Sequence, residues 1–241
     1  MEELKLTPEE LKDIIKDAEV IGKGFFGTVF KYKDRLIKLD EGLYKVLNAN
    51  DRIFADEMFE RRYRWNKETF VNPKQIEILA SKQKDITLTK LPQGIVNVKG
   101  IIPGIIIPYH EDHKNLELLP KDDYVKLLKI LRKLLLAVKE LADNEIAHHD
   151  LIRANTEGSK NIDYNILYKD DTPKIIDLDG ELVKYGENFK DASKMYSDLG
   201  AIILGYFKTN NLPTDIKSDI ITDEKKAQEL IEELDFRLKG K

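Results

Sequence analysis

The feature that most constrains the fold of this chain is a glycine-rich segment followed by a single lysine inside an apolar run. Residues 21–30 read I-G-K-G-F-F-G-T-V-F, in which Gly22, Gly24 and Gly27 fit the pattern G-x-G-x-x-G. Glycine lets backbone N–H groups approach a polyphosphate, because no Cβ stands in the way. Lys38 follows in the apolar run L-I-K-L and would direct a cation at whatever the loop covers. The plainer interpretation is a tight turn between two strands.

Four short motifs in the second half of the chain carry imidazole, carboxylate and amide groups. They read I-A-H-H-D-L at 146–151, N-I-L-Y at 165–168, K-I-I-D-L-D-G at 174–180 and S-D-L-G at 197–200. Each alone has an ordinary interpretation: the histidines as core or surface residues, the aspartates as helix caps and the asparagine as a turn residue. Their order behind the glycine loop and Lys38 is far more specific than any one of them.

Together these motifs resemble the protein-kinase family, including its small bacterial members, from about Val20 to about Phe207. The resemblance implies an α+β, two-lobed fold, in which a small antiparallel sheet with one main helix is joined to a minimal, mostly helical C-terminal lobe. We expect the N-terminal lobe to span residues 1–112 and the C-terminal lobe residues 113–241. The resemblance also implies ATP and Mg²⁺ as cofactors, and transfer of the γ-phosphate to a hydroxyl.

Carried over position by position, the resemblance assigns catalytic roles to single residues. Lys38 matches the lysine that binds the α- and β-phosphates, and Asp150 matches the aspartate that accepts the hydroxyl proton. Asn165 and Asp177 match the two magnesium ligands, and hard oxygen donors are what this ion prefers. Arg153 lies beside the position of a lysine that Ser/Thr kinases hold near the γ-phosphate, so we include it among the catalytic candidates.

The same resemblance implies where the nucleotide base would bind. Val29 would cap the purine, with Gly22, Gly24 and Gly27 along the phosphates, and Ile107 would lie behind the adenine. Pro108 would offer its carbonyl, and His110 its backbone N–H, to the edge of the base. Proline loses no needed donor at this position, because the family uses only the carbonyl there.

The partner of Lys38 in the family is a glutamate on the main helix of the small lobe. Glu77 is our choice, because P-K-Q-I-E-I-L-A has a helical pattern and a candidate strand follows at a suitable distance. An unusually long connection at 41–72 holds the rivals Glu57, Glu60 and Glu68. A solvent-exposed glutamate is the ordinary interpretation for each of them.

Two asparagines are candidates for the magnesium ligand. Asn155 lies five residues after Asp150, which is the usual family spacing, but it is followed by Thr-Glu-Gly-Ser. Asn165 is instead followed by Ile-Leu-Tyr, and the family places a short apolar strand directly after the metal-binding asparagine. We therefore expect 154–163 to be an insertion, and a hairpin to bring Asn165 and Asp177 to one ion.

Several residues depart from the family pattern, so the sequence does not decide which molecule accepts the phosphate. His149 stands where many protein kinases have arginine, Asp179 replaces the glycine of D-F-G, and no A-P-E follows. The D-x-D pattern is also similar to that of aminoglycoside- and choline-type phosphotransferases. A Ser or Thr of a protein is the expected acceptor. The alternatives are a small-molecule kinase on the same scaffold, and a catalytically silent pseudokinase that acts as a binding module, which the retained catalytic residues oppose.

Composition limits the partners. Among 241 residues, 40 are basic and 44 acidic, the net charge is −4 and no basic stripe is present, so no nucleic-acid partner is expected. The chain has no cysteine, which excludes disulfides and fits a reducing compartment. Its apolar runs are too short to span a membrane and its N-terminus is acidic, so we expect a cytoplasmic protein with no membrane partner.

Periodicity predicts the remaining elements. Helices are expected at 7–17, 73–84, 121–142, 197–208 and 223–238. Strands are expected within 18–39, within 94–109 with a break at Pro103–Gly104, and at 166–168 and 174–176. Val125 is expected on the buried face of its helix. Asp198 would either brace the loop around Asp150, as in the family, or cap a helix.

Overall fold

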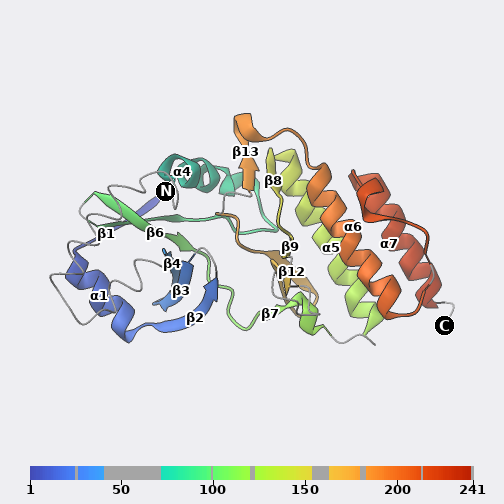
Figure 1. Cartoon of the computed structure of the whole chain (residues 1–241), viewed down its shortest axis with the longest axis horizontal. Helices are drawn as coiled ribbons and strands as arrows, with labels where there is room; N and C mark the ends of the chain where they lie inside the picture. The colour runs from blue at the N-terminus through green and yellow to red at the C-terminus, as the bar shows by residue number, and fades with distance from the viewer. Residues whose placement is uncertain are drawn as a thin grey trace. The chain divides into compact units, whose positions relative to one another are not determined.

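The computed structural model describes residues 1–24, 27–40, 72–98, 100–119, 123–153, 163–179, 183–212 and 214–239. The chain has an α+β architecture and divides into two compact units (Figure 1). Unit 1 comprises Met1–Lys84 with Leu91–His110, and unit 2 comprises Asp85–Lys90 with Glu111–Lys241. The boundary expected after residue 112 lies beside the division after His110. The assignment of Asp85–Lys90 to unit 2 was not predicted.

Unit 1 contains a mixed sheet of six strands in the order β1-β5-β6-β4-β3-β2. The strands are β1 (Glu2–Leu6), β2 (Glu19–Gly24), β3 (Gly27–Tyr32), β4 (Arg35–Leu39), β5 (Gly94–Val98) and β6 (Ile101–Ile107). All neighbours are antiparallel except β1, which runs parallel to β5 with Leu4 opposite Val96. The prediction of a purely antiparallel sheet is therefore wrong at β1. This strand has only two apolar residues, Leu4 and Leu6, too few to give a clear alternating pattern.

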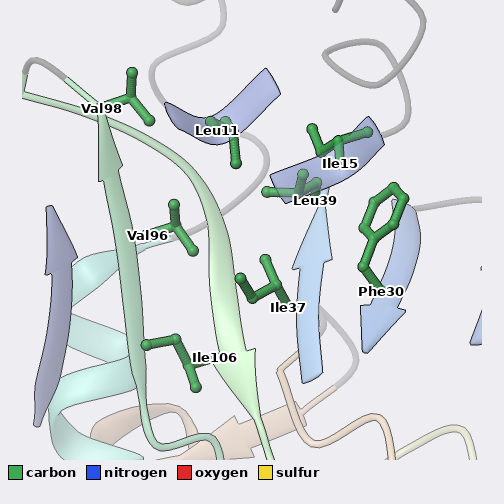
Figure 2. Close-up of a cluster of buried hydrophobic side chains, with 8 residues drawn as sticks. All are labelled: Leu11, Ile15, Phe30, Ile37, Leu39, Val96, Val98 and Ile106. Atoms are coloured by element: carbon green, nitrogen blue, oxygen red, sulfur yellow. The ribbon is translucent and has the colours of Figure 1, made fainter. Parts of the chain in front are cut away.

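Two helices lie within the described residues of unit 1, and each packs on its own cluster of sheet residues. Helix α1 (Pro8–Asp17) begins, as predicted, at a capping box in which Thr7 and Glu10 exchange side chain-to-backbone hydrogen bonds. Helix α4 (Pro73–Lys82) starts at Asn72, which accepts a hydrogen bond from the backbone of Lys74, and it runs into the 3-10 turn η1 (Gln83–Asp85). Figure 2 shows the α1 cluster, which consists of Leu11, Ile15, Phe30, Ile37, Leu39, Val96, Val98 and Ile106. The α4 cluster consists of Ile76, Ile95 and Ile105.

The turn between β5 and β6 lies earlier than predicted. Gly100 has φ +85° at this turn, whereas Pro103 and Gly104 lie inside β6. Val96 pairs with Gly104 but Val98 with Ile101, so β6 carries an extra residue, a bulge that accommodates a proline without a ladder N–H. A Cβ on Gly104 would lie 2.5 Å from the carbonyl oxygen of Lys38, so close strand approach requires glycine there.

Unit 2 is built on three long helices with short strands at their side. The helices are α5 (Tyr124–Asp143), α6 (Ser193–Thr209) and α7 (Glu224–Lys239), with the 3-10 turns η2 (Leu116–Leu118), η3 (Gly186–Asn188) and η4 (Ser218–Ile220). The strands are β7 (Lys114–Asn115), β8 (Ile146–His148), β9 (Ile152–Arg153), β10 (Asp163–Tyr164), β11 (Ile166–Lys169), β12 (Thr172–Ile175) and β13 (Val183–Tyr185). No helix within the described ranges is long and apolar enough to cross a membrane.

Two details of the helices differ from the prediction. Val125 is 52% exposed, because it lies in the first turn of α5 on the side away from the buried Leu127 and Leu134. Helix α6 begins at Ser193, before the predicted start, and the side chain of Asp191 accepts a hydrogen bond from the Ser193 backbone. Asp198 therefore lies inside the helix, and the capping alternative for it is wrong.

Candidate functional site

The glycine-rich segment forms the hairpin β2–β3. Gly24 pairs with Gly27 and Gly22 with Val29, while the connection at 25–26 lies outside the described residues. Gly22 does not have a positive φ, and no atom lies within 4 Å of the position a Cβ would take. Neither backbone strain nor internal packing therefore requires glycine at position 22. The register of the hairpin shifts between Val20 and Gly22, and such an irregularity is an ordinary place for glycine.

Lys38 lies on the face of the sheet that carries α4. In β4 it is opposite Val29 of β3 and Ile105 of β6, and directly opposed residues share a face. Ile105 packs in the α4 cluster, so Val29 and Lys38 lie on that side as well. The Lys38 side chain is only 7% exposed. A lysine buried to this extent is unusual, because desolvation of an ammonium group is expensive.

Glu77 does not pair with Lys38. Ile76 and Leu79 turn the buried face of α4 toward the sheet, and Glu77 is exposed. No ion pair or hydrogen bond joins the side chains of these two described residues, so the structure does not support the predicted pairing. The rivals Glu57, Glu60 and Glu68 lie outside the described residues, as does nearly all of the connection at 41–72.

The predicted base-binding residues end β6 and begin the coil after it. Ile107 is opposite Leu36, which places it on the same face as Lys38. Pro108 and His110 follow as half-exposed coil. Between them, Tyr109 accepts a hydrogen bond of 3.3 Å from the Lys31 ammonium, whose nitrogen lies 4.6 Å from the centre of the ring. Val29, Lys38 and Ile107 are thus gathered on one face of the sheet in unit 1.

In unit 2, His148 links the loop of Asp150 to Ile176, the residue between β12 and Asp177. The His148 ring is almost completely buried at the end of β8. Its Nδ1 accepts a hydrogen bond of 3.1 Å from the Asp150 backbone N–H, so Nε2 carries the proton that it donates to the Ile176 carbonyl, at 3.0 Å. Burial lowers the pKa of His148, although the carboxylates of Asp177 and Asp150 oppose this. The neutral His148 ring therefore connects the Asp150 loop to Ile176 through two hydrogen bonds.

Asn165 joins the same two segments a second time. Its Nδ2 donates to the Asp150 carbonyl at 2.6 Å and lies 3.4 Å from Oδ2 of the Asp150 carboxylate. Its backbone N–H donates to the Leu151 carbonyl, and its carbonyl accepts from the Ile176 N–H, both at 3.0 Å. Asn165 is buried rather than in solvent, and it is anchored on both sides of the candidate site.

The hairpin predicted between Asn165 and Asp177 is present. Strand β11 pairs with β12 from Ile166 opposite Ile175 to Lys169 opposite Thr172. Asp177 follows β12 with φ +62°, a left-handed conformation that costs a non-glycine residue about 1 kcal/mol. Five other described non-glycine residues also have a positive φ, so this conformation alone does not distinguish Asp177 from a turn residue.

The residues on either side of the predicted insertion, in β9 and β10, pair as a short antiparallel ladder. Arg153 of β9 is opposite Asp163 of β10, and Ile152 is opposite Tyr164. Residue 163 thus belongs to the ladder, and the rest of the insertion, with Asn155, lies outside the described residues. The backbone of Arg153 is placed three residues after Asp150. The structure gives no further account of its predicted role.

Asp198 is buried in α6, and its Oδ2 accepts no hydrogen bond from the described residues. Its implied role of bracing the Asp150 loop stays a prediction, and its neighbour Lys194 was not predicted. The side chain of Lys194 forms an ion pair with Asp198, one helical turn away. The i, i+4 spacing of lysine and aspartate was the available signal, but such spacing is common on exposed helix surfaces.

Within the described ranges, no group of three or more His, Asp or Glu side chains is arranged to hold a metal ion. Asn165 and Asp177 would supply two oxygen donors, and Mg²⁺ is commonly held by few protein ligands together with phosphates and water. A scan against protein-family models found no matching family, and a search of curated proteins found no matching relative.

Proposed function

We propose that this chain is an ATP- and Mg²⁺-dependent phosphotransferase of the protein-kinase type, with a Ser or Thr hydroxyl of a protein as the acceptor. The observation that carries the proposal is the double link, through His148 and Asn165, between the Asp150 loop and Ile176, which directly precedes Asp177. Ordinary core packing does not require a buried polar connection of this kind.

Asp150 accepts the proton of the attacking hydroxyl in this mechanism. The Asn165 amide lies 3.4 Å from one oxygen of the Asp150 carboxylate and thereby restricts its orientation. Asn165, through its side-chain oxygen, and Asp177 would hold Mg²⁺, which when bound neutralises charge on the phosphates. Arg153 is assigned to the neighbourhood of the γ-phosphate, on the sequence argument alone.

Unit 1 supplies the nucleotide-binding groups. Lys38 presents its ammonium to the α- and β-phosphates, and Gly22 permits backbone N–H groups to approach them. Val29 and Ile107 contact the base, with the carbonyl of Pro108 and the N–H of His110 at its edge. The shared sheet face of Val29, Lys38 and Ile107 supports this assignment. The absence of cysteine supports a cytoplasmic location for the reaction.

A small-molecule acceptor is the second candidate, and the length of the chain between Asp177 and α6 favours it. Only residues 178–192 lie between them, and β13, within this stretch, is already paired with β8. Little chain remains there to hold an extended peptide. Asp179, in the position of the family glycine, favours the same alternative.

The test is incubation with γ-labelled ATP and Mg²⁺, with mixed protein acceptors or with aminoglycoside and choline acceptors. Transfer to protein supports the main proposal, and transfer only to small molecules supports the second. The Asp150→Asn variant is the control and should lose about three orders of magnitude in rate. Nucleotide binding without transfer to any acceptor would support the third alternative, a pseudokinase that acts as a binding module.

A further inference from the structure

Lys31 of β3 lies on the same face of the sheet as the candidate nucleotide-binding residues. It is two residues beyond Val29 along the strand, and side chains alternate between the two faces, so Lys31 and Val29 share a face. Lys31 is also opposite Leu36, which is in turn opposite Ile107. The face that carries Val29, Lys38 and Ile107 therefore carries Lys31 as a further cation.

Lys31 and Lys38 lie toward opposite ends of this face. Lys38 is opposite Val29, whereas Lys31 is opposite Leu36, two residues nearer the start of β4. Two residues of strand correspond to a separation of about 7 Å along the sheet. The Lys31 ammonium is within hydrogen-bond distance of Tyr109, in the coil after β6 where the edge of the base is proposed to bind. Lys31 therefore belongs to the base end of the candidate site, and Lys38 to the phosphate end.

Lys31 contacts Tyr109 in two ways. Its ammonium donates a hydrogen bond of 3.3 Å to the tyrosine hydroxyl oxygen and lies over the ring, 4.6 Å from its centre. A cation within about 6 Å of the ring centre is attracted by the electron-rich face of the aromatic ring. The hydrogen bond is partly buried, so water competes with it less than at an open surface. The side chain of Tyr109 is therefore held against β3.

The backbone of Tyr109 determines how the proposed base-binding groups are oriented. The carbonyl of Pro108 and the N–H of His110 belong to the two peptide groups that meet at the Tyr109 Cα. Each peptide group is planar, so the two backbone torsions of Tyr109 set the orientation of one group relative to the other. The ladder between β4 and β6 ends before this point, at Leu36 opposite Ile107. The contact of the Tyr109 side chain with Lys31 thus restrains the coil beyond the end of the ladder.

We propose that Lys31 and Tyr109 are a positioning pair for the nucleotide base: by holding the Tyr109 side chain to β3, Lys31 fixes the two peptide groups at which the edge of the base binds. The role at the base rests on the proposed function, whereas the contact between the two side chains does not. Because Lys31 acts at the base end, its removal should weaken the contribution of the base to affinity and leave that of the phosphates unchanged.

The contact is tested by NMR on the full chain with isotopically labelled lysine. Protons that lie over an aromatic ring resonate upfield, because the ring current opposes the applied field there. The ε-methylene protons of Lys31 should resonate upfield of those of Lys16, an exposed lysine of α1, and Tyr109→Leu should remove this difference. Equal resonance positions for the two lysines in the wild type overturn the pair.

The positioning role is tested by calorimetric titration of the full chain with MgATP and with magnesium tripolyphosphate, which has the phosphates but no base. Lys31→Met should raise the Kd for MgATP about fivefold, as expected for the loss of one hydrogen bond of ordinary strength, and leave the Kd for tripolyphosphate unchanged. Lys31→Arg should restore the Kd for MgATP, because a guanidinium also donates hydrogen bonds and stacks on aromatic rings. Lys16→Met is the matched control and should change neither Kd.

A double-mutant cycle decides whether Lys31 acts through Tyr109. Tyr109→Leu should weaken MgATP binding as Lys31→Met does, and the two together should bind no more weakly than either alone. Additive losses, an unchanged Kd for MgATP in Lys31→Met, or an equal rise in the Kd for tripolyphosphate overturns the positioning role. If the wild type binds no MgATP, the proposed function and the positioning role both fail, while the NMR measurement still decides whether the pair forms.

Discussion

At the scale of single residues, the Lys38→Met variant is expected to fold and to lose at least about two orders of magnitude in phosphotransfer rate. The reason is that a cation on the phosphates acts mainly on positioning and on developing charge. Methionine has a similar length and suits a site that is 7% exposed, so the unfolding midpoint should hold. Single-turnover rates with labelled ATP check this. A wild-type rate in this variant would show that the lysine is structural.

The sequence predicted which polar residues belong to the candidate site, but not how their side chains are oriented. The hairpin after Asn165 was predictable, because turn residues separate two short apolar runs. The hydrogen bonds from Asn165 to the Asp150 loop depend on tertiary packing, which no local pattern contains. The choice of Glu77 is not supported for the same reason: periodicity predicts the helix, but the sheet decides which face of α4 is buried.

The two asparagines are expected to differ. Asn165→Ala should reduce magnesium-dependent turnover severely, because it removes the predicted ligand and the 2.6 Å hydrogen bond to the Asp150 carbonyl. Asn155→Ala should have a milder effect. Titrating Mg²⁺ at fixed ATP separates the two roles, since loss of a ligand raises the magnesium requirement. The opposite ranking would overturn the assigned register.

At the scale of elements, local signals sufficed where a helix has its own caps. Thr7 with Glu10 fixed the start of α1, as predicted. Strand β1 escaped prediction because five mostly charged residues carry little pattern, and its place is set by pairing with β5. The break assigned to Pro103 was wrong because a bulge accommodates the proline inside β6. Long-range pairing, rather than propensity, decided both cases.

Glu140 of α5 is expected to stabilise the segment that follows η1, at Thr87 and Leu88, within unit 2. Its carboxylate accepts hydrogen bonds from the Thr87 N–H (2.8 Å), the Thr87 hydroxyl (2.7 Å) and the Leu88 N–H (2.8 Å). Glu140→Ala should lower the free energy of unfolding by about 1–3 kcal/mol. It should also speed hydrogen exchange at the amides of Thr87 and Leu88. Glu229→Ala, at an exposed glutamate, is the control. Unchanged exchange would mean the three bonds are not maintained in solution.

At the scale of the whole molecule, each unit carries its own set of candidate functional residues. Unit 1 holds Lys38 in its sheet, and unit 2 holds Asn165 and Asp177 beside its hairpin. Sequence order alone predicted which motifs belong to each part of the chain. It could not predict that Asp85–Lys90 belongs to unit 2, because hydrogen bonds to α5 determine that assignment.

A nucleotide that binds only the folded chain should stabilise it against unfolding. At a hundredfold excess over its Kd, MgATP should add about 2.7 kcal/mol to the free energy of unfolding. Asp177→Ala should remove the part of this increment that depends on Mg²⁺ and leave the part given by ATP with a chelator, because Lys38 and Val29 remain. Lys38→Met should instead diminish both parts. Thermal unfolding with ATP, MgATP and Mg²⁺ alone measures the increments. If MgATP stabilises Asp177→Ala as much as the wild type, Asp177 is not the metal ligand.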